Sequence, residues 1–202
     1  MKSTAELIEK RIKSKARGTI LFPADFTDLG TSEAIRLHLF RLEKMGLIKR
    51  ISQGIYVRPK ESKLLGILTP SAEEVASSIA KRDRIRCIPT GSYALHALGL
   101  STQVPMKIVF LTDGSARVIH IGNRSITFKK TTPKYLMTKG EISGLVIQAV
   151  KEIGKGKISL EEEQRIIELL KQESHQNLAH DIKLAPVWIQ KIMQKAQTHD
   201  ED

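Results

Sequence analysis

Cysteine is nearly absent from this 202-residue sequence, and so are long apolar runs. The single Cys87 excludes an internal disulfide framework and any zinc or iron–sulfur site built from several cysteines, and it suits a reducing cytoplasm. No apolar run approaches the roughly 18 residues of a membrane span. The opening residues, MKSTAELIEKR, lack the apolar stretch of a secretory signal. We therefore exclude secreted, disulfide-stapled and membrane-spanning classes and expect a cytoplasmic protein.

Positive charge is what the sequence has in excess. With 41% apolar residues the chain can form one or two domains with a buried core, and its net charge is +11. Basic residues outnumber acidic ones by 13 to 6 in residues 1–60 and by 12 to 5 in residues 61–140, whereas residues 141–202 hold 8 basic and 11 acidic residues. This asymmetry indicates either a surface for a polyanion or a solvated basic surface, and motifs must decide between them.

Residues 1–60 have the element order of a winged helix-turn-helix domain. Apolar spacing predicts a helix over 4–15, a stub strand over 19–22, a short helix over 23–29, a third helix from Thr31-Ser32 to about Met45, and hairpin strands over 47–51 and 55–58. The third helix should bury Ile35, Leu39 and Leu42. Gly54 can adopt the left-handed conformation of a three-residue hairpin loop. In such domains the third helix enters the major groove and the hairpin lies along the DNA backbone.

Polar and basic side chains of this segment are suited to DNA. Guanidinium groups match guanine edges and phosphate oxygens, while hydroxyl and N–H groups at a helix start can hold a phosphate. On this basis the DNA-binding candidates are Thr31, Ser32, Arg36, Arg41, Lys49, Arg50 and Arg58. A winged helix that only docks proteins can also carry surface arginines, and this alternative stays open.

Leu37 and Phe40 depart from the pattern, because they lie on the side of the third helix opposite Ile35 and Leu39. We expect them to pack on the next domain or on a dimer mate, or to contact thymine methyl groups, with packing as the first expectation.

Residues 64–138 are predicted to form a small α+β domain with an antiparallel sheet, after a polar joint at 61–63. Ser71 and Glu74 fit a capping box that opens a helix ending near Lys81. The remaining predicted elements are a strand over 85–88, a helix over 89–98, and strands over 106–112, 117–122 and 125–130.

Catalytic and metal-binding patterns are incomplete in this chain. Gly91-Ser92 followed by Asp113 is similar to nucleotidyltransferase motifs, but those enzymes need a pair of carboxylates two residues apart, and Leu111 and Ser115 flank Asp113. Asp113-Gly114 is therefore predicted to be a turn, and Cys87 a buried core residue. The histidines lack metal-ligand spacing, and Gly154-Lys155-Gly156 indicates a break between helices. We expect no catalytic residues, no metal and no cofactor.

Residues 139–202 are predicted to be a helical region with an acidic tail. Helices are expected over 141–153, from a capping box at Ser159-Glu162 through Lys171, and over 178–196 with a break at Pro186. The run Glu161-Glu162-Glu163 is either a solvated face or a surface for a basic protein.

Taken together, several segments resemble the AbiEi-type antitoxins and their transcriptional-regulator relatives. The likeness covers about residues 5–135 and lies in FPADFTDLG, RLEKMGLIKRISQGIYVRP, IPTGSYALHALGLSTQVP and IVFLTDG. In that family the winged helix represses its own operon, and the second domain counteracts a nucleotidyltransferase toxin. The resemblance marks Ser32, Arg36, Arg41, Lys49, Arg50 and Gln53 as DNA-contact candidates and implies no catalytic residues.

The sequence thus predicts a non-enzymatic regulator that binds double-stranded DNA at its own promoter and acts as the antitoxin of a toxin–antitoxin pair, with a homodimer as a compatible state. The alternatives are a protein-docking module without DNA affinity and a divergent nucleotidyltransferase.

Overall fold

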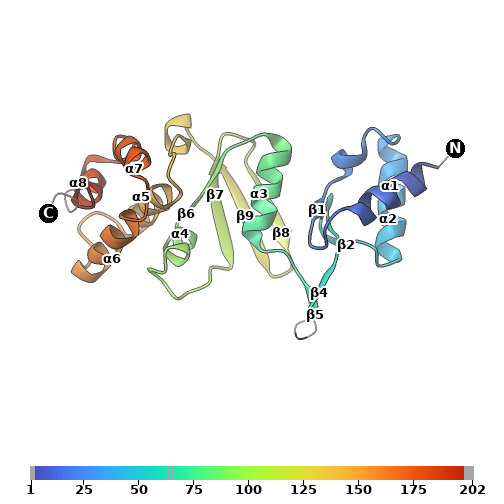
Figure 1. The fold of residues 1–202 in the computed structure, drawn as a ribbon, viewed down its shortest axis with the longest axis horizontal. Coiled ribbons are helices and arrows are strands. Elements are labelled where there is room, and N and C mark those ends of the chain that lie inside the picture. Colours follow the sequence, from blue (N-terminus) through green and yellow to red (C-terminus); the bar gives the residue numbers. More distant parts are fainter. Residues whose placement is uncertain (1–2, 63, 65, 198–202) are drawn as a thin grey trace. The chain divides into compact units, whose positions relative to one another are not determined.

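The computed structural model describes residues 3–62, 64 and 66–197 of the chain. The chain divides into two units, Met1–Ser78 with His120–Gly122, and Ile79–Ile119 with Asn123–Asp202. Helices and β-sheet occur in both, which confirms the predicted α+β class (Figure 1). The acidic tail, residues 198–202, lies outside the described residues. Within the described part of the chain, no helix combines the length and apolar character needed to span a membrane.

The first unit begins with a helix whose start is fixed by its own side chains. In α1 (Thr4–Ser14), Ser3 Oγ accepts a hydrogen bond from the Glu6 N–H, while the Glu6 carboxylate accepts one from the Ser3 N–H. The following elements are β1 (Ile20–Leu21), the 3-10 helix η1 (Pro23–Phe26), α2 (Ser32–Lys44), β2 (Lys49–Ser52), β3 (Ile55–Val57), β4 (Lys60–Ser62) and β5 (Gly66–Leu68). The predicted order is confirmed, but the second helix is a single 3-10 turn, because so short a segment cannot nucleate an α-helix.

An apolar core connects α1 and α2 with a three-stranded sheet. Its buried members are Ile8, Ile12, Leu21, Phe26, Ile35, Leu39, Leu42, Ile48 and Tyr56. In the sheet, β3 is central and pairs antiparallel with β1 and with β2. Gly54 has the predicted left-handed conformation, with φ of +68°. The loop between β2 and β3 is shorter than the predicted three residues, because Ser52 pairs with Ile55 and leaves only Gln53 and Gly54 between the strands. Burial of Ile35, Leu39 and Leu42 confirms the predicted inward stripe of α2 and leaves the opposite side of that helix exposed.

The polar joint expected at 61–63 is instead part of a second hairpin. Strand β4 pairs antiparallel with β5, with Lys60 opposite Leu68 and Glu61 opposite Ile67. Lys63 itself lies outside the described residues. Polar composition was misleading here, because an exposed two-stranded hairpin needs no apolar face along β4.

The second unit contains a four-stranded sheet followed by helices. Its elements are α3 (Ala72–Asp83), which begins in the first unit, β6 (Cys87–Thr90), α4 (Ser92–Ala97), β7 (Lys107–Thr112), β8 (Arg117–Ile121), β9 (Arg124–Lys130), η2 (Pro133–Leu136), α5 (Glu141–Ile153), α6 (Leu160–Leu170), α7 (His175–Ile182) and α8 (Val187–Lys195). The capping boxes predicted at Ser71 and Ser159 are both confirmed. The helix predicted over 89–98 starts only at Ser92, because Pro89 and Thr90 extend β6.

The sheet of this unit is mixed, which corrects the prediction of an antiparallel sheet. The strand order is β6-β7-β9-β8, and β6 pairs antiparallel with β7, but β7 and β9 run parallel, with Phe110 opposite Phe128. Strand β9 carries the buried Ile126 and Phe128, whereas β8 exposes Val118. Burial therefore favours β9 beside β7 and leaves β8 at the sheet edge, although β8 precedes β9 in sequence.

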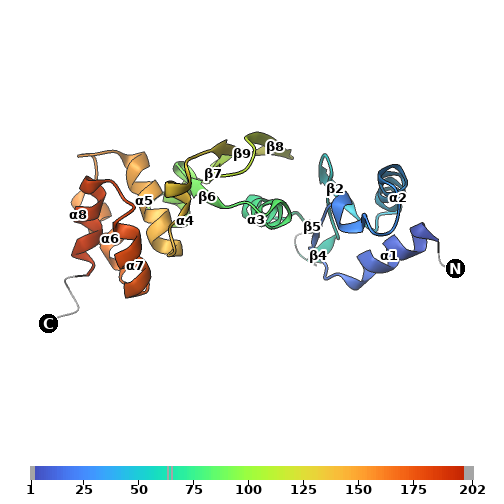
Figure 2. The same ribbon diagram turned by 90° about the horizontal axis from the view of Figure 1, so that it is seen from above.

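The C-terminal helices lie together beside α4 in Figure 2. Buried side chains of these helices and of α4 form one apolar core. Helix α5 contacts α4, α6 and α7, while α8 contacts α6 and α7. The bounds of α5 agree with the prediction, and the break at Pro186 separates α7 from α8. The segment 64–138 and the C-terminal region are thus joined through Ala94 and Leu98, which lie in the same core as Val146 and Ile166.

Candidate nucleic-acid interface

The exposed face of α2 carries two of the predicted DNA contacts at its margins. Arg36 and Arg41 are both exposed, on the side away from the buried Ile35 and Leu39. A helix turns by about 100° per residue, so two residues five positions apart point about 140° away from each other. The two guanidinium groups therefore flank the exposed face rather than share its centre.

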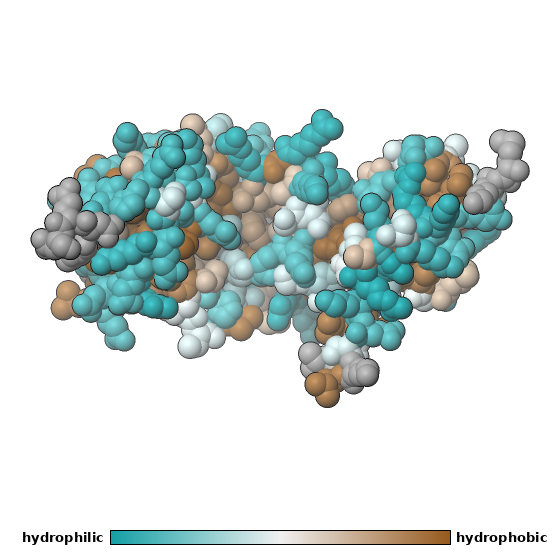
Figure 3. Space-filling model, viewed as in Figure 1, coloured by the Kyte–Doolittle hydropathy of each residue, from teal (hydrophilic) through white to brown (hydrophobic). Residues whose placement is uncertain are grey.

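The centre of that face is apolar. Leu37 is 47% exposed and Phe40 is 51% exposed, and Met45 follows at the end of the helix with 71%. The ammonium group of Lys44 lies over the Phe40 ring, 5.4 Å from its centroid. Hydrophilic side chains predominate on the face of the molecule seen in Figure 3, with hydrophobic ones exposed between them. Both side chains are accessible on their own unit, and their packing on the next domain or on a dimer mate stays a prediction.

The start of α2 is capped by one of the predicted residues. Thr31 Oγ1 accepts a hydrogen bond from the Ala34 N–H at 3.3 Å, which satisfies one of the free N–H groups of the first turn. Thr31 and Ser32 are both exposed. The cap leaves the Thr31 hydroxyl hydrogen available to donate, so the group can still contact a phosphate oxygen.

The hairpin between β2 and β3 presents the next group of predicted residues. Lys49, Arg50 and Gln53 are exposed, and β2 forms the edge of its sheet. Arg50 Nε donates to the Ser52 carbonyl oxygen at 3.3 Å. Lys49 and Arg50 are neighbours in a strand, so their side chains leave opposite faces of the sheet. If one face of the hairpin lies against a DNA backbone, only one of these two side chains can therefore contact a phosphate fully.

Arg58 lies in a different setting from the other candidates. Its side chain is half-buried, and Nη1 donates to the main-chain carbonyl oxygen of Lys15. Its backbone continues the pairing, because Arg58 N–H donates to Thr19 O at 2.9 Å and Arg58 O accepts from Gly18 N–H at 2.7 Å. These contacts hold the end of α1 against the sheet and give the arginine a structural role independent of DNA.

The basic side chains of α2 and of the β2–β3 hairpin differ from Arg11 in the first unit in having no acidic partner in the described part of the chain. Within the described residues, no carboxylate forms an ion pair with Arg36, Arg41, Lys49 or Arg50. Arg11, by contrast, contacts both carboxylate oxygens of Asp28 at 2.6 Å and holds the pKa of that carboxyl below its usual range. The positive charge of α2 and the hairpin thus remains available to an external polyanion.

Side chains considered for other chemistry have local structural partners. Asp113 lies between β7 and β8, as the predicted turn requires, and its Oδ1 accepts from the Arg86 N–H at 2.9 Å. Cys87 is half-buried rather than in the core, since β6 is an edge strand of its sheet. Burial raises the pKa of its thiol, which disfavours the nucleophilic thiolate.

The acidic run of α6 is partly used within its own unit. Glu162 completes the capping box with Ser159, and Glu163 forms an ion pair with Lys195 at 2.5 Å. Glu161 is exposed. A basic partner would therefore meet a weaker acidic surface than the three consecutive glutamates suggest.

Sequence reasoning missed Asp181, which is fully buried in α7. Its carboxylate accepts hydrogen bonds from the N–H groups of Lys139 and Gly140 and from Ser143 Oγ, and it pairs with His180. One signal was present in the sequence: Asp181 falls between Leu178 and Ile182, on the stripe that α7 buries.

Comparison with known proteins places the chain in a family. Residues 7–178 match DUF6088, described as a family of unknown function, and because the match covers most of the chain, the chain belongs to this family. No curated protein matches the chain.

Proposed function

We propose that this DUF6088 protein is a DNA-binding transcriptional regulator whose N-terminal unit is a winged helix-turn-helix. In this proposal α2 is the recognition helix, the β2–β3 hairpin is the wing, and the DNA is the double-stranded promoter of its own operon. The observation that carries the proposal is the set of exposed cations without ion-pair partners on these two elements, Arg36, Arg41, Lys49 and Arg50, among the residues that the structure describes. Such cations gain affinity by displacing counterions from phosphates.

The geometry of α2 suggests which parts of the DNA Arg36 and Arg41 would each contact. An α-helix fills the major groove of B-DNA, whose walls are the two phosphate backbones. Side chains about 140° apart on such a helix reach toward opposite walls or toward base edges beside them. Leu37 and Phe40 would then face the groove floor, where apolar side chains contact thymine methyl groups.

We further propose that the protein is the antitoxin of a toxin–antitoxin pair and is itself not an enzyme. Support comes from the resemblance of residues 88–105 and 108–114 to AbiEi-type antitoxins, in which the corresponding domain counteracts a nucleotidyltransferase toxin. These residues form β6, α4 and β7 together with the segment between α4 and β7. A cytoplasmic location follows from this role.

A reporter gene under the chain's own promoter tests the regulatory proposal. Wild-type protein should repress the reporter, and the double variant Arg36→Ala/Arg41→Ala should derepress it. The matched control is Lys171→Ala/Lys191→Ala, which removes the same charge from exposed positions on the C-terminal helices and should repress normally. Full repression by the arginine variant would contradict the proposal.

The antitoxin role needs a separate test. Co-expression of the chain with the neighbouring gene should rescue cells from growth arrest by that gene's product. Rescue by Arg36→Ala/Arg41→Ala is expected as well, because protection is assigned to the second unit. Failure of the wild-type chain to rescue would contradict the antitoxin role without affecting DNA binding.

A protein-docking module without DNA affinity is the second candidate function. It is favoured by the exposed apolar centre of α2, since contiguous apolar surface marks interaction sites in soluble proteins. Under this candidate, Leu37→Ala/Phe40→Ala abolishes function, whereas Arg36→Ala/Arg41→Ala leaves it intact. The DNA-binding proposal requires the arginine variant to fail.

A further inference from the structure

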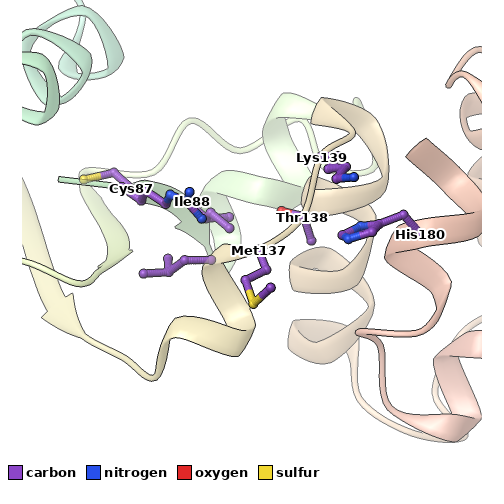
Figure 4. A pocket seen from close by; sticks show the side chains of 8 residues that line it. Cys87, Ile88, Met137, Thr138, Lys139 and His180 are labelled. Carbon is purple, nitrogen blue, oxygen red and sulfur yellow. The ribbon is translucent and has the colours of Figure 1, made fainter. Parts of the chain in front are cut away.

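The second unit contains a hollow of about 500 Å³ between the sheet and the helices (Figure 4). Residues from three parts of the unit line it. The first part is the entry into β6, with Arg86, Cys87 and Ile88; the second is the end of η2 and the segment after it, with Leu136, Met137, Thr138 and Lys139; the third is α7, with His180. Its volume falls within the range of about 300–1,000 Å³ that is typical of small-molecule sites.

His180 is held in a fixed orientation at one side of this hollow. Its Nδ1 lies 2.7 Å from Oδ1 of the fully buried Asp181. An ionised carboxylate only accepts hydrogen bonds, so Nδ1 carries the proton and Nε2 is left for another partner. In Figure 4 the imidazole extends from α7 toward Thr138, whereas the Cys87 sulfur points away from it, so the two do not form a thiol–imidazole pair.

Asp181 is in turn fixed by uncharged hydrogen-bond donors. Its Oδ2 accepts from the Gly140 N–H at 2.8 Å and from Ser143 Oγ at 2.5 Å, and its Oδ1 accepts from the Lys139 N–H at 2.9 Å. The negative charge is thereby bound inside the protein, behind His180. What the hollow presents to a ligand is the imidazole, not the carboxylate.

The polar lining of the hollow is one-sided in charge. Arg86 and Lys139 are both exposed, and no carboxylate of the described chain pairs with either side chain. No acidic residue is among the lining residues. Arginine and lysine side chains that line one space are donors that bind phosphate groups. The unprotonated Nε2 of His180 can instead accept a hydrogen bond from a hydroxyl or N–H group of the ligand.

The remaining lining is mostly apolar, with Ile88, Leu136, Met137 and the half-buried Cys87, and Thr138 adds one hydroxyl group. Inorganic phosphate would leave these side chains without a partner, so the ligand should carry an apolar body next to its anionic group. Met137 is 47% exposed, and its thioether favours an aromatic body because sulfur contacts aromatic rings well.

We propose that this hollow binds a small phosphate ester with an aromatic body, of the nucleoside monophosphate class. Arg86 and Lys139 hold the phosphate, Nε2 of His180 accepts a hydrogen bond from a sugar hydroxyl or a ring N–H, and Ile88, Leu136 and Met137 contact the ring. The site lies wholly within the second unit and is independent of the DNA-binding proposal.

Calorimetric titration of the full chain tests the site. The probes are the four ribonucleoside monophosphates, the matching nucleosides and inorganic phosphate. At least one monophosphate should bind about tenfold or more tightly than its nucleoside and than phosphate alone, a difference of about 1.4 kcal/mol. Absence of monophosphate binding at millimolar concentration, or equal binding of the nucleoside, would overturn the proposal.

Variants identify the location of binding. Arg86→Ala/Lys139→Ala should weaken monophosphate binding about tenfold or more, His180→Gln should weaken it as well, and Lys171→Ala/Lys191→Ala should bind like wild type. The imidazole signal lost in His180→Gln should shift when wild-type protein is titrated in NMR spectra. Unchanged affinity in the arginine–lysine variant would place the ligand elsewhere and overturn the proposal.

Duplex DNA distinguishes a small-molecule site from an extension of a nucleic-acid surface. We expect promoter DNA not to displace the monophosphate, and Arg36→Ala/Arg41→Ala to bind it normally. Displacement by DNA that is lost in Arg86→Ala/Lys139→Ala would assign the hollow to DNA instead. If the chain failed to bind promoter DNA but still bound the monophosphate, the DNA-binding proposal would be wrong and the proposal for the hollow would stand.

Discussion

Arg36 and Arg41 lie on opposite margins of the exposed face of α2, with Leu37 and Phe40 between them. This arrangement follows from helix geometry once Ile35, Leu39 and Leu42 are buried. It gives the exposed face of the helix cationic margins and an apolar centre.

The hairpin should contribute about one phosphate contact. Lys49 and Arg50 leave opposite faces of an edge strand, so the double variant Lys49→Ala/Arg50→Ala should reduce the salt dependence of DNA affinity by about one phosphate, a change in log–log slope of about 0.9. The loss should be equal for promoter and unrelated duplexes, because phosphates carry no sequence information. An unchanged slope would remove the hairpin from the interface.

Arg58 should matter for stability. Removing its guanidinium leaves the Lys15 carbonyl oxygen without that donor, so Arg58→Ala should lower the free energy of unfolding by about 1–2 kcal/mol. Urea unfolding of the full chain measures this, with the exposed Lys60→Ala as a control for the lost charge. Equal midpoints for the two variants would show that the contact contributes nothing.

Asp83 should make stability depend on pH in the acid range. Hydrogen bonds from Arg82, and then from Arg117, lower the pKa of this carboxyl to about 2. Because the folded-state pKa lies below the unfolded value, the stabilisation is complete above about pH 4 and is lost as the pH falls toward 2.

The comparison of wild type with Asp83→Asn isolates this effect. Their difference in unfolding free energy should be about 1–2 kcal/mol at neutral pH, a range that allows for the partial exposure of the carboxylate, and should shrink between pH 4 and 2. A difference that stays constant from pH 7 to 2 would contradict this assignment.

Asp181 should be required as a carboxylate. In Asp181→Asn a single side-chain oxygen remains, and the new amide hydrogens oppose the N–H donors of Lys139 and Gly140. We expect a loss of about 1–3 kcal/mol in unfolding free energy, measured by urea titration, since buried donors lose their acceptor. Glu161→Gln, an exposed carboxylate-to-amide change, should have no effect.

Local signals predicted much of the fold. The capping boxes at Ser71 and Ser159 fix helix starts within a few residues, and Gly54 fixes a hairpin, because each depends on neighbours in sequence. The inward stripe of α2 was readable for the same reason, since helical periodicity alone decides which of its residues are buried.

Long-range relationships were not predictable in this way. The parallel pairing of β7 with β9 places β9 between two strands that precede it, a choice decided by burial of Ile126 and Phe128 in the folded sheet. The contacts of Asp181 join residues about forty positions apart. Likewise, the hollow beside His180 exists only where three elements meet: β6, α7 and the segment that precedes α5.

The most direct test of DNA binding by α2 is the affinity of the purified full chain for its own promoter duplex, measured at several salt concentrations. For wild type, log affinity should fall linearly with log salt, with a slope of about −0.9 for each phosphate contacted. Arg36→Ala/Arg41→Ala should weaken binding by about 1–3 kcal/mol for each arginine that contacts a base edge, whereas Lys171→Ala/Lys191→Ala should match wild type. Equal affinity of the arginine variant and wild type at every salt concentration would contradict the assignment of α2 as the DNA-binding helix.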